Sequence, residues 1–181
     1  MLERFEKILP FPLKPLLLAG LVAISVMACN PFAPTLDDAV TDPNKLLGDR
    51  TTVNGFFEWF RNSYQIRDST LYGQLLAPEF KFTYFDFSNN TEISWNRDVD
   101  MNTTHKLFRG VRSTTLQWNQ YITADTSLSD TVAIAERAFN LTINQDDATI
   151  YRGVGSARIV LVRKSKSEPW KMRSWYDKSD F

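Results

Sequence analysis

Side chains suited to proton transfer near neutral pH or to soft-metal ligation are scarce, because the chain contains one histidine, His105, and one cysteine, Cys29. We therefore expect no zinc site and no other metal centre. A catalytic triad would depend on His105, and no Gly-x-Ser-x-Gly turn accompanies it. The Gly-x-Gly at 153–155 stands alone within an apolar segment, so it predicts a bulge or bend and not a phosphate site. No cofactor is expected.

Three polar side chains in apolar surroundings are the candidate pocket groups. His105 shares helical spacing with Met101 and Phe108, which points it toward the interior or mouth of a pocket. An imidazole with its ordinary pKa of about 6.5 could act there as a general base. The alternative is a partly buried histidine that is hydrogen-bonded to the backbone.

Glu136 and Arg158 are the other two candidates. Arg158 alternates with valines, so it either faces solvent or enters the pocket as an anion-binding group. If the chain turns near 146–147, Glu136 lies opposite Arg158, and a cross-strand ion pair is the alternative to a functional role. Asp86, Asp98 and Asp100 are expected to cap helices or close turns, because they stand at the ends of the expected elements.

Cys29 follows an uncharged apolar stretch of 13 residues at 16–28, which is preceded by a segment carrying Arg4, Lys7 and Lys14. This order is typical of a signal peptide. A helix of that length rises about 20 Å and falls short of the roughly 30 Å hydrocarbon core of a bilayer. A permanent transmembrane helix is therefore the weaker interpretation.

The four residues at 26–29 resemble the bacterial lipobox, in which small Ala28 precedes the thiol of Cys29 that accepts diacylglycerol. The resemblance implies cleavage between Ala28 and Cys29 and two or three acyl chains, which together anchor a protein stably. The alternatives are a plain secretory signal with an incidental cysteine and an uncleaved signal anchor. Asn30 is not the aspartate that retains some lipoproteins in an inner membrane, so we expect a lipid-anchored protein of the bacterial cell envelope, with the outer membrane favoured.

Composition supports one folded domain behind this anchor. Basic and acidic residues number 21 each, so no net field attracts nucleic acid, and no nucleic-acid partner is expected. A hydrophobic share of 43% in 181 residues suffices for a core. We expect a signal peptide at 1–28, an acylated N-terminus and proline-rich tether at 29–48, and one domain at 49–181.

The domain begins with helical periodicity. Phe56, Phe60 and Tyr64 lie on one helical face, and Thr51 or Thr52 is available as the N-cap. Leucines at 71, 75 and 76 predict a second short helix that Pro78 ends. The aromatic run at 80–87 predicts a strand buried on both faces, and a turn at 88–90 separates it from a third helix at 98–108.

From residue 110 onward the period becomes two. Strands are predicted from about 116 to 122, and at 131–143, 150–163 and 170–176. Their short polar connections leave no room for crossover helices, so they form an antiparallel meander. Helices followed by one strongly curved antiparallel sheet constitute an α+β fold in which the N-terminal helices pack on one face of the sheet.

This pattern resembles the nuclear transport factor 2-like superfamily. The resemblance is carried by the aromatic helix at 56–60, the stretch at 64–82 and the Trp-rich end at 170–177. It implies a cone-shaped sheet around an apolar pocket, which some members use for isomerase, dehydratase or epoxide hydrolase chemistry. No local motif fixes a matching catalytic residue in this chain.

The expected function is that of a membrane-anchored, non-catalytic module that binds a small apolar ligand or an envelope protein. A small-molecule isomerase, dehydratase or hydrolase that uses polar groups of the pocket is the alternative. A third possibility is a structural module that forms a homodimer through the sheet. A contiguous apolar patch on the sheet face opposite the helices would indicate such a partner.

Overall fold

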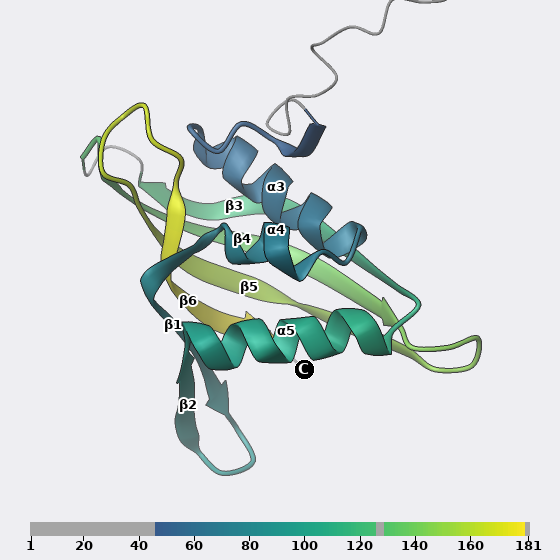
Figure 1. The fold of residues 1–181 in the computed structure, drawn as a ribbon. Coiled ribbons are helices and arrows are strands. Elements are labelled where there is room, and N and C mark those ends of the chain that lie inside the picture. The colour runs from purple at the N-terminus through teal and green to yellow at the C-terminus, as the bar shows by residue number, and fades with distance from the viewer. Residues whose placement is uncertain (1–45, 126–128, 180–181) are drawn as a thin grey trace, which may run out of the picture. The chain divides into compact units, whose positions relative to one another are not determined.

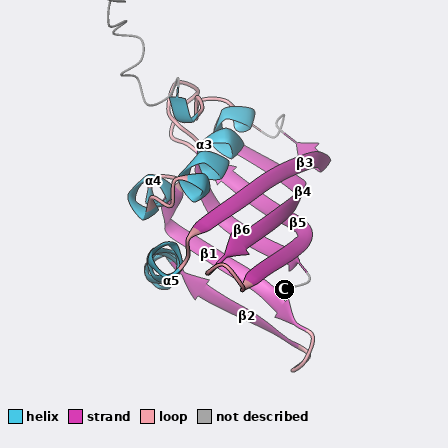
Figure 2. Ribbon diagram, turned by 90° about the vertical axis from the view of Figure 1, so that its right-hand side faces the viewer, coloured by secondary structure: helices cyan, strands magenta, loops and turns pink. Residues whose placement is uncertain are grey.

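The computed structural model describes residues 46–125 and 129–179. The expected signal peptide, Cys29 and nearly all of the tether lie outside the described residues. The elements are α3 (Val53–Gln65), α4 (Ser69–Gly73), β1 (Leu76–Asp86), β2 (Thr91–Asn96), α5 (Arg97–Gly110), β3 (Ser113–Asp125), β4 (Val132–Asn144), β5 (Ile150–Val162) and β6 (Lys171–Ser179). The six strands form one sheet in the order β2-β1-β6-β5-β4-β3. Figures 1 and 2 show α3, α4 and α5 on one face of this curved sheet, which confirms the α+β prediction.

The first helices begin where their caps stand. Thr52 accepts a hydrogen bond from the backbone N–H of Gly55 at 3.0 Å, which satisfies a donor that the first turn of α3 leaves free. The predicted second helix is too long, because α4 ends at Gly73 and Leu76 already belongs to β1. Pro78 lies inside that strand, between residues where the β1–β6 register shifts, so its missing N–H removes no regular ladder bond.

The hairpin of β1 and β2 contains the predicted turn. Asp86 closes it by accepting the N–H groups of Ser88 and Asn89, at 2.9 and 3.2 Å. The short strand β2 was not predicted. Burial of the aromatic run on both faces is wrong, because Phe82 is buried whereas Phe87 is 83% exposed. The helices cover one face of the sheet only, which leaves the other side of this run to solvent.

The predicted third helix is α5, which begins at the N-cap Asn96, and the four predicted carboxyl-terminal strands are β3 to β6. These strands pair antiparallel in sequence order, as a meander does. The predicted bulge at 153–155 is wrong, since the β4–β5 register runs without a shift through it. A Cβ atom on Gly155 would lie 2.4 Å from the Cα atom of Ser179, so the close approach of β6 accounts for that glycine.

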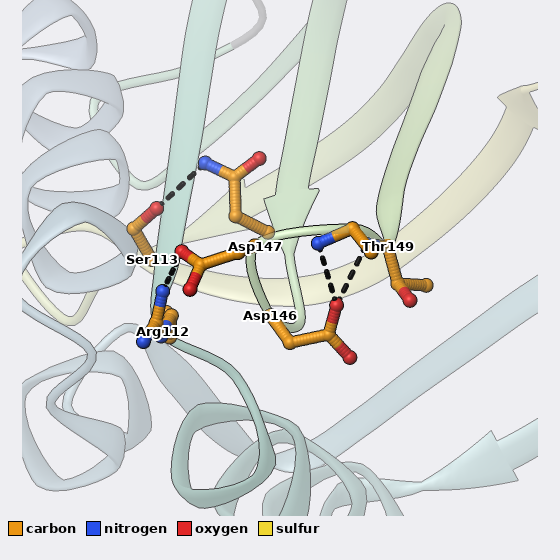
Figure 3. Close-up of polar contacts among 7 residues, drawn as sticks. Arg112, Ser113, Asp146, Asp147 and Thr149 are labelled. Carbon is orange, nitrogen blue, oxygen red and sulfur yellow. Dashed lines mark hydrogen bonds and ion pairs between the residues drawn. The ribbon is translucent and has the colours of Figure 1, made fainter.

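The β4–β5 turn falls at 146–147, as predicted (Figure 3). Asp146 accepts the backbone N–H groups of Ala148 at 2.9 Å and Thr149 at 2.7 Å. Asp147 forms an exposed ion pair with Arg112, which follows α5. This turn therefore ties the end of α5 to the sheet through polar contacts.

One pairing in the sheet joins distant parts of the chain. β1 runs parallel to β6 and places Phe82 beside Trp175. The helices cover this junction with aromatic side chains, and Phe60 of α3 is the centre of the cluster. Its ring lies 5.1 to 5.4 Å from the rings of Tyr64, Tyr72, Trp118 and Trp175. Among the described residues, no helix is both long enough and apolar enough to cross a bilayer.

Candidate functional site

A cavity of about 170 Å³ lies between the sheet and the helices α3 and α5. We call it the inner cavity. A cavity of about 150 Å³ holds a benzene molecule, so this volume suits a ligand about the size of one ring. Its walls are mostly aromatic or aliphatic, with four polar side chains among them. The lining residues are Phe60, Tyr64, Phe82, Trp95, Asp100, Thr103, Thr104, Leu107, Leu116, Trp118, Phe139, Leu141, Trp175 and Asp177.

Asp100 enters the inner cavity from the first turn of α5 and is buried. One carboxylate oxygen accepts the hydroxyl of Tyr72 at 2.7 Å, and the other accepts the indole N–H of Trp95 at 2.9 Å. Burial raises the pKa of Asp100, and these two hydrogen bonds oppose that shift. Burial, followed by the charge of Asp100, raises the pKa of the Tyr72 hydroxyl. Tyr72 therefore stays protonated and acts as a donor.

Asp177 enters from β6, on the same face of the strand as Trp175. Its oxygens accept the backbone N–H and the hydroxyl of Ser179, each at 3.1 Å. Burial raises the pKa of this carboxyl as well. Neither Asp177 nor Asp100 forms an ion pair with another residue in the part of the chain that the structure describes.

A second, larger hollow adjoins the inner cavity. This outer groove has a volume of about 830 Å³ and lies at the carboxyl ends of β1 and β6. Phe82, Trp95 and Asp177 line both spaces. The rings of Phe82 and Trp95 stack with their centroids 4.3 Å apart. Asp177 thus stands at the boundary, where a ligand entering from the groove would meet it.

Two of the residues that line the inner cavity have unpaired donors. The indole nitrogens of Trp118 and Trp175 are buried and have no hydrogen-bond partner among the described residues. An unpaired buried donor costs about 1–3 kcal/mol. Trp95 differs from both, because its indole is paired with Asp100.

The expectation that His105 points into the pocket is wrong. His105 is exposed, and its Nδ1 atom lies 3.1 Å from the hydroxyl of Ser69. The buried face of α5 is formed by Asp100, Thr104 and Phe108, which recur every fourth residue. His105 follows Thr104 and is therefore rotated about 100° away from that face. The alternative, a backbone bond in a partly buried setting, does not hold either.

Glu136 and Arg158 face each other across β4 and β5, as predicted, but on the face of the sheet opposite the helices. Glu136 bonds to Lys178 at 2.9 Å and to the hydroxyl of Ser156 at 3.0 Å. The hydrogen bond from Lys178 is the largest cause that lowers the pKa of Glu136, and Arg158 adds only a smaller attraction. Neither candidate lines the inner cavity.

The sequence pattern did not predict the two carboxylates that line the inner cavity. Asp100 was interpreted as a capping residue, whereas the cap of α5 is Asn96. The i, i+4 spacing of Asp100, Thr104 and Phe108 was the available evidence that Asp100 faces inward. For Asp177 the evidence was its alternation with Trp175 in the last strand. These two patterns show which residues share a face, but only the structure shows that the helices cover that face.

The comparisons with known proteins agree with this geometry at the level of fold. The chain matches no protein-family model and no curated protein. Among solved structures it is similar to a scytalone dehydratase-like protein from Novosphingobium aromaticivorans, with 12% identity, 71% of this chain and 82% of that chain covered, and a TM-score of 0.57.

Two further structures support the same fold. An NTF2-like protein of unknown function in nutrient uptake from Rhodospirillum rubrum has 10% identity and a TM-score of 0.56, with 72% of this chain and 99% of that one covered. A type 2 hexachlorocyclohexane dehydrochlorinase has 7% identity and a TM-score of 0.58, with coverage of 73% and 85%. The domain therefore has the nuclear transport factor 2-like (NTF2-like) α+β fold.

Proposed function

We propose that the protein is a lipid-anchored module of the bacterial cell envelope whose inner cavity binds a small, largely apolar ligand without converting it. The observation that carries this proposal is the inner cavity itself. It has mostly aromatic and aliphatic walls and a few polar groups, which is the usual composition of a small-molecule site. Its volume limits the buried part of the ligand to about one ring.

The polar groups support binding more than catalysis. Both oxygens of Asp100 already accept hydrogen bonds, so this carboxylate holds Tyr72 and Trp95 in place. The single histidine lies outside the inner cavity. Proton transfer would then depend on Asp177, with no imidazole to assist it.

A second candidate function is a lyase or isomerase in which Asp177 removes a proton from carbon. The raised pKa of Asp177, caused by burial, makes it a stronger base than an exposed aspartate, which favours this alternative. Two of the similar structures are named as a scytalone dehydratase-like protein and a hexachlorocyclohexane dehydrochlorinase. The alternative predicts turnover of the bound ligand, whereas the first proposal predicts that it is released unchanged.

Native mass spectrometry of the full-length protein in a non-ionic detergent tests ligand binding. The unmodified protein should carry a bound small molecule or accept one. Leu107→Trp fills the inner cavity from α5 and should abolish the adduct, whereas Val99→Trp, at an exposed position of the same helix, should retain it. An adduct that persists in Leu107→Trp would contradict the proposed location. Mass analysis of the released ligand before and after incubation distinguishes binding from turnover.

The anchor is proposed from the sequence and has its own test. Cys29→Ser should prevent labelling by a palmitate analogue and release the protein from the membrane fraction. Labelling that persists in Cys29→Ser would overturn the proposal. Asn30→Asp should shift the protein from the outer to the inner membrane in a density gradient. A homodimer through the sheet is a separate proposal, which the same native mass spectra test.

A further inference from the structure

The charges that line the inner cavity are all of one sign. Asp100 and Asp177 are the two charged side chains among its lining residues, and neither has a cationic partner among the residues that the structure describes. Ionised carboxylates removed from water are unfavourable unless hydrogen bonds or a countercharge compensate them. The inner cavity therefore selects against anions and leaves a place for a positive charge.

The two carboxylates differ in their position relative to the outer groove. Asp100 accepts donors on both oxygens, from Tyr72 on α4 and Trp95 on β2. Asp177 also accepts on both oxygens, from Ser179 and the backbone that follows it in its own strand. Asp177, unlike Asp100, borders the outer groove, through which a ligand would enter. Asp177 is thus the carboxylate that an entering ligand meets.

The aromatic rings near Asp177 also favour a positively charged ligand. Phe82 stacks on Trp95 at 4.3 Å and meets Trp175 edge to face at 5.1 Å, and all three rings line the inner cavity together with Asp177. The face of an aromatic ring attracts an organic cation within about 6 Å of its centroid, and the attraction grows when water is excluded. Rings and a carboxylate together are the chemistry that recognises an ammonium group.

We propose that the ligand of the inner cavity is a small organic ammonium ion. Its charge lies against Asp177 and the aromatic rings. This inference rests on the proposed ligand-binding function and adds the charge and class of the ligand.

A matched pair of ligands tests the charge directly. Choline and 3,3-dimethylbutan-1-ol have the same shape, but a carbon atom replaces the charged nitrogen in the second. In titration calorimetry with the full-length protein in a non-ionic detergent, choline should bind at least about tenfold more tightly than the alcohol. Asp177→Asn should reduce this preference to about twofold or less, since it removes the charge and keeps the shape. Glu136→Gln alters a carboxylate on the opposite face and should leave the preference unchanged.

Loss of the preference for choline on the unmodified protein overturns the inference. Equal binding of the two compounds, or tighter binding of the alcohol, means that the ligand is neutral, and the proposed ligand-binding function then survives. If neither compound binds, the inference fails, and the Leu107→Trp mass experiment decides separately whether the cavity is a binding site. If Asp177→Asn does not fold by circular dichroism, the comparison of the two ligands on the unmodified protein decides alone.

Discussion

Asp177 and Glu136 lie on opposite faces of the same sheet, and the protein gives their carboxylates opposite properties. Asp177 faces the helices, has no cationic partner among the described residues, and has a pKa raised by burial. Glu136 lies on the outer face, is paired with Lys178, and has a lowered pKa. Asp177, on the helix-covered face, is therefore a candidate binding group. Glu136, on the uncovered face, forms an ion pair.

The largest difference in stability is expected between the loss of a buried aromatic ring and the loss of an exposed one. Phe60→Ala removes a fully buried ring that contacts five others, and it should lower the free energy of unfolding by about 3–5 kcal/mol. Phe87→Ala changes a ring that is 83% exposed and should alter stability by less than about 0.5 kcal/mol. Urea denaturation measures both. Similar losses for the two variants would mean that Phe87 is covered in the protein.

Two tyrosine–carboxylate hydrogen bonds give a closer comparison. Tyr72→Phe removes the 2.7 Å bond to buried Asp100 and should destabilise the protein by about 1–3 kcal/mol, because the carboxylate loses a donor without gaining water. Tyr176→Phe removes a 3.1 Å bond to exposed Glu92, where water can replace the hydroxyl, and should cost less than about 0.5 kcal/mol. An equal effect of both changes would show that water reaches Asp100.

The pH dependence of stability should differ in sign between the faces. Asp177 binds its proton more tightly in the folded protein than in the unfolded chain. The stability that Asp177 contributes therefore falls as pH rises from its unfolded pKa of about 3.9 through its folded pKa. Glu136 releases its proton more readily when folded, so the stability it contributes is present above its unfolded pKa and is lost as pH falls through the folded pKa.

Asp177→Asn should therefore improve stability near pH 7 relative to pH 4, whereas Glu136→Gln should reduce it over the same interval. Urea midpoints across this pH range, with both variants measured in one buffer series, report the two slopes. If Asp177→Asn left the slope unchanged, the carboxyl would have the same pKa in the folded and unfolded chains.

The smallest expected effect on stability is that of the ion pair between Glu136 and Lys178. A double-mutant cycle with Glu136→Gln and Lys178→Met should give a coupling of about 0–1 kcal/mol, since the Lys178 side chain is 46% exposed and solvent and side-chain entropy weaken its attraction to Glu136. The coupling should decrease at about 1 M salt, where charges are screened beyond roughly 3 Å. A coupling that salt does not change would indicate that the pair is shielded from solvent.

The local parts of this architecture follow from the sequence because their determinants are close together. Thr52 caps a helix whose first free donor is three residues away, and Asp86 closes a turn with the next residues along the chain. The meander from β3 to β6 pairs consecutive strands, so alternation and short turns were sufficient to predict it. The carboxyl-terminal end of α4 was predicted wrongly because Leu75 and Leu76 fit the end of a helix and the start of a strand equally well.

The candidate site depends on contacts between residues far apart in sequence. Parallel pairing of β1 with β6 sets Phe82 beside Trp175, and α5 then brings Asp100 to the same cavity as Asp177. No local sequence pattern predicts which strands are neighbours in the sheet. His105 was predicted to face the pocket because it shares helical spacing with Met101 and Phe108, although the buried face of α5 passes through Thr104 instead.

The order of the residues is enough to establish the periodicities: which residues of β6 share a face, which residues of α5 share another, and that an apolar stretch precedes Cys29. Which of those faces is covered follows only from the packing of the whole domain. Alternation is a property of a few neighbouring residues, whereas exclusion of water requires elements from the whole domain. For this reason the residue type of Asp177 was visible in the sequence, and the direction of its pKa shift was not.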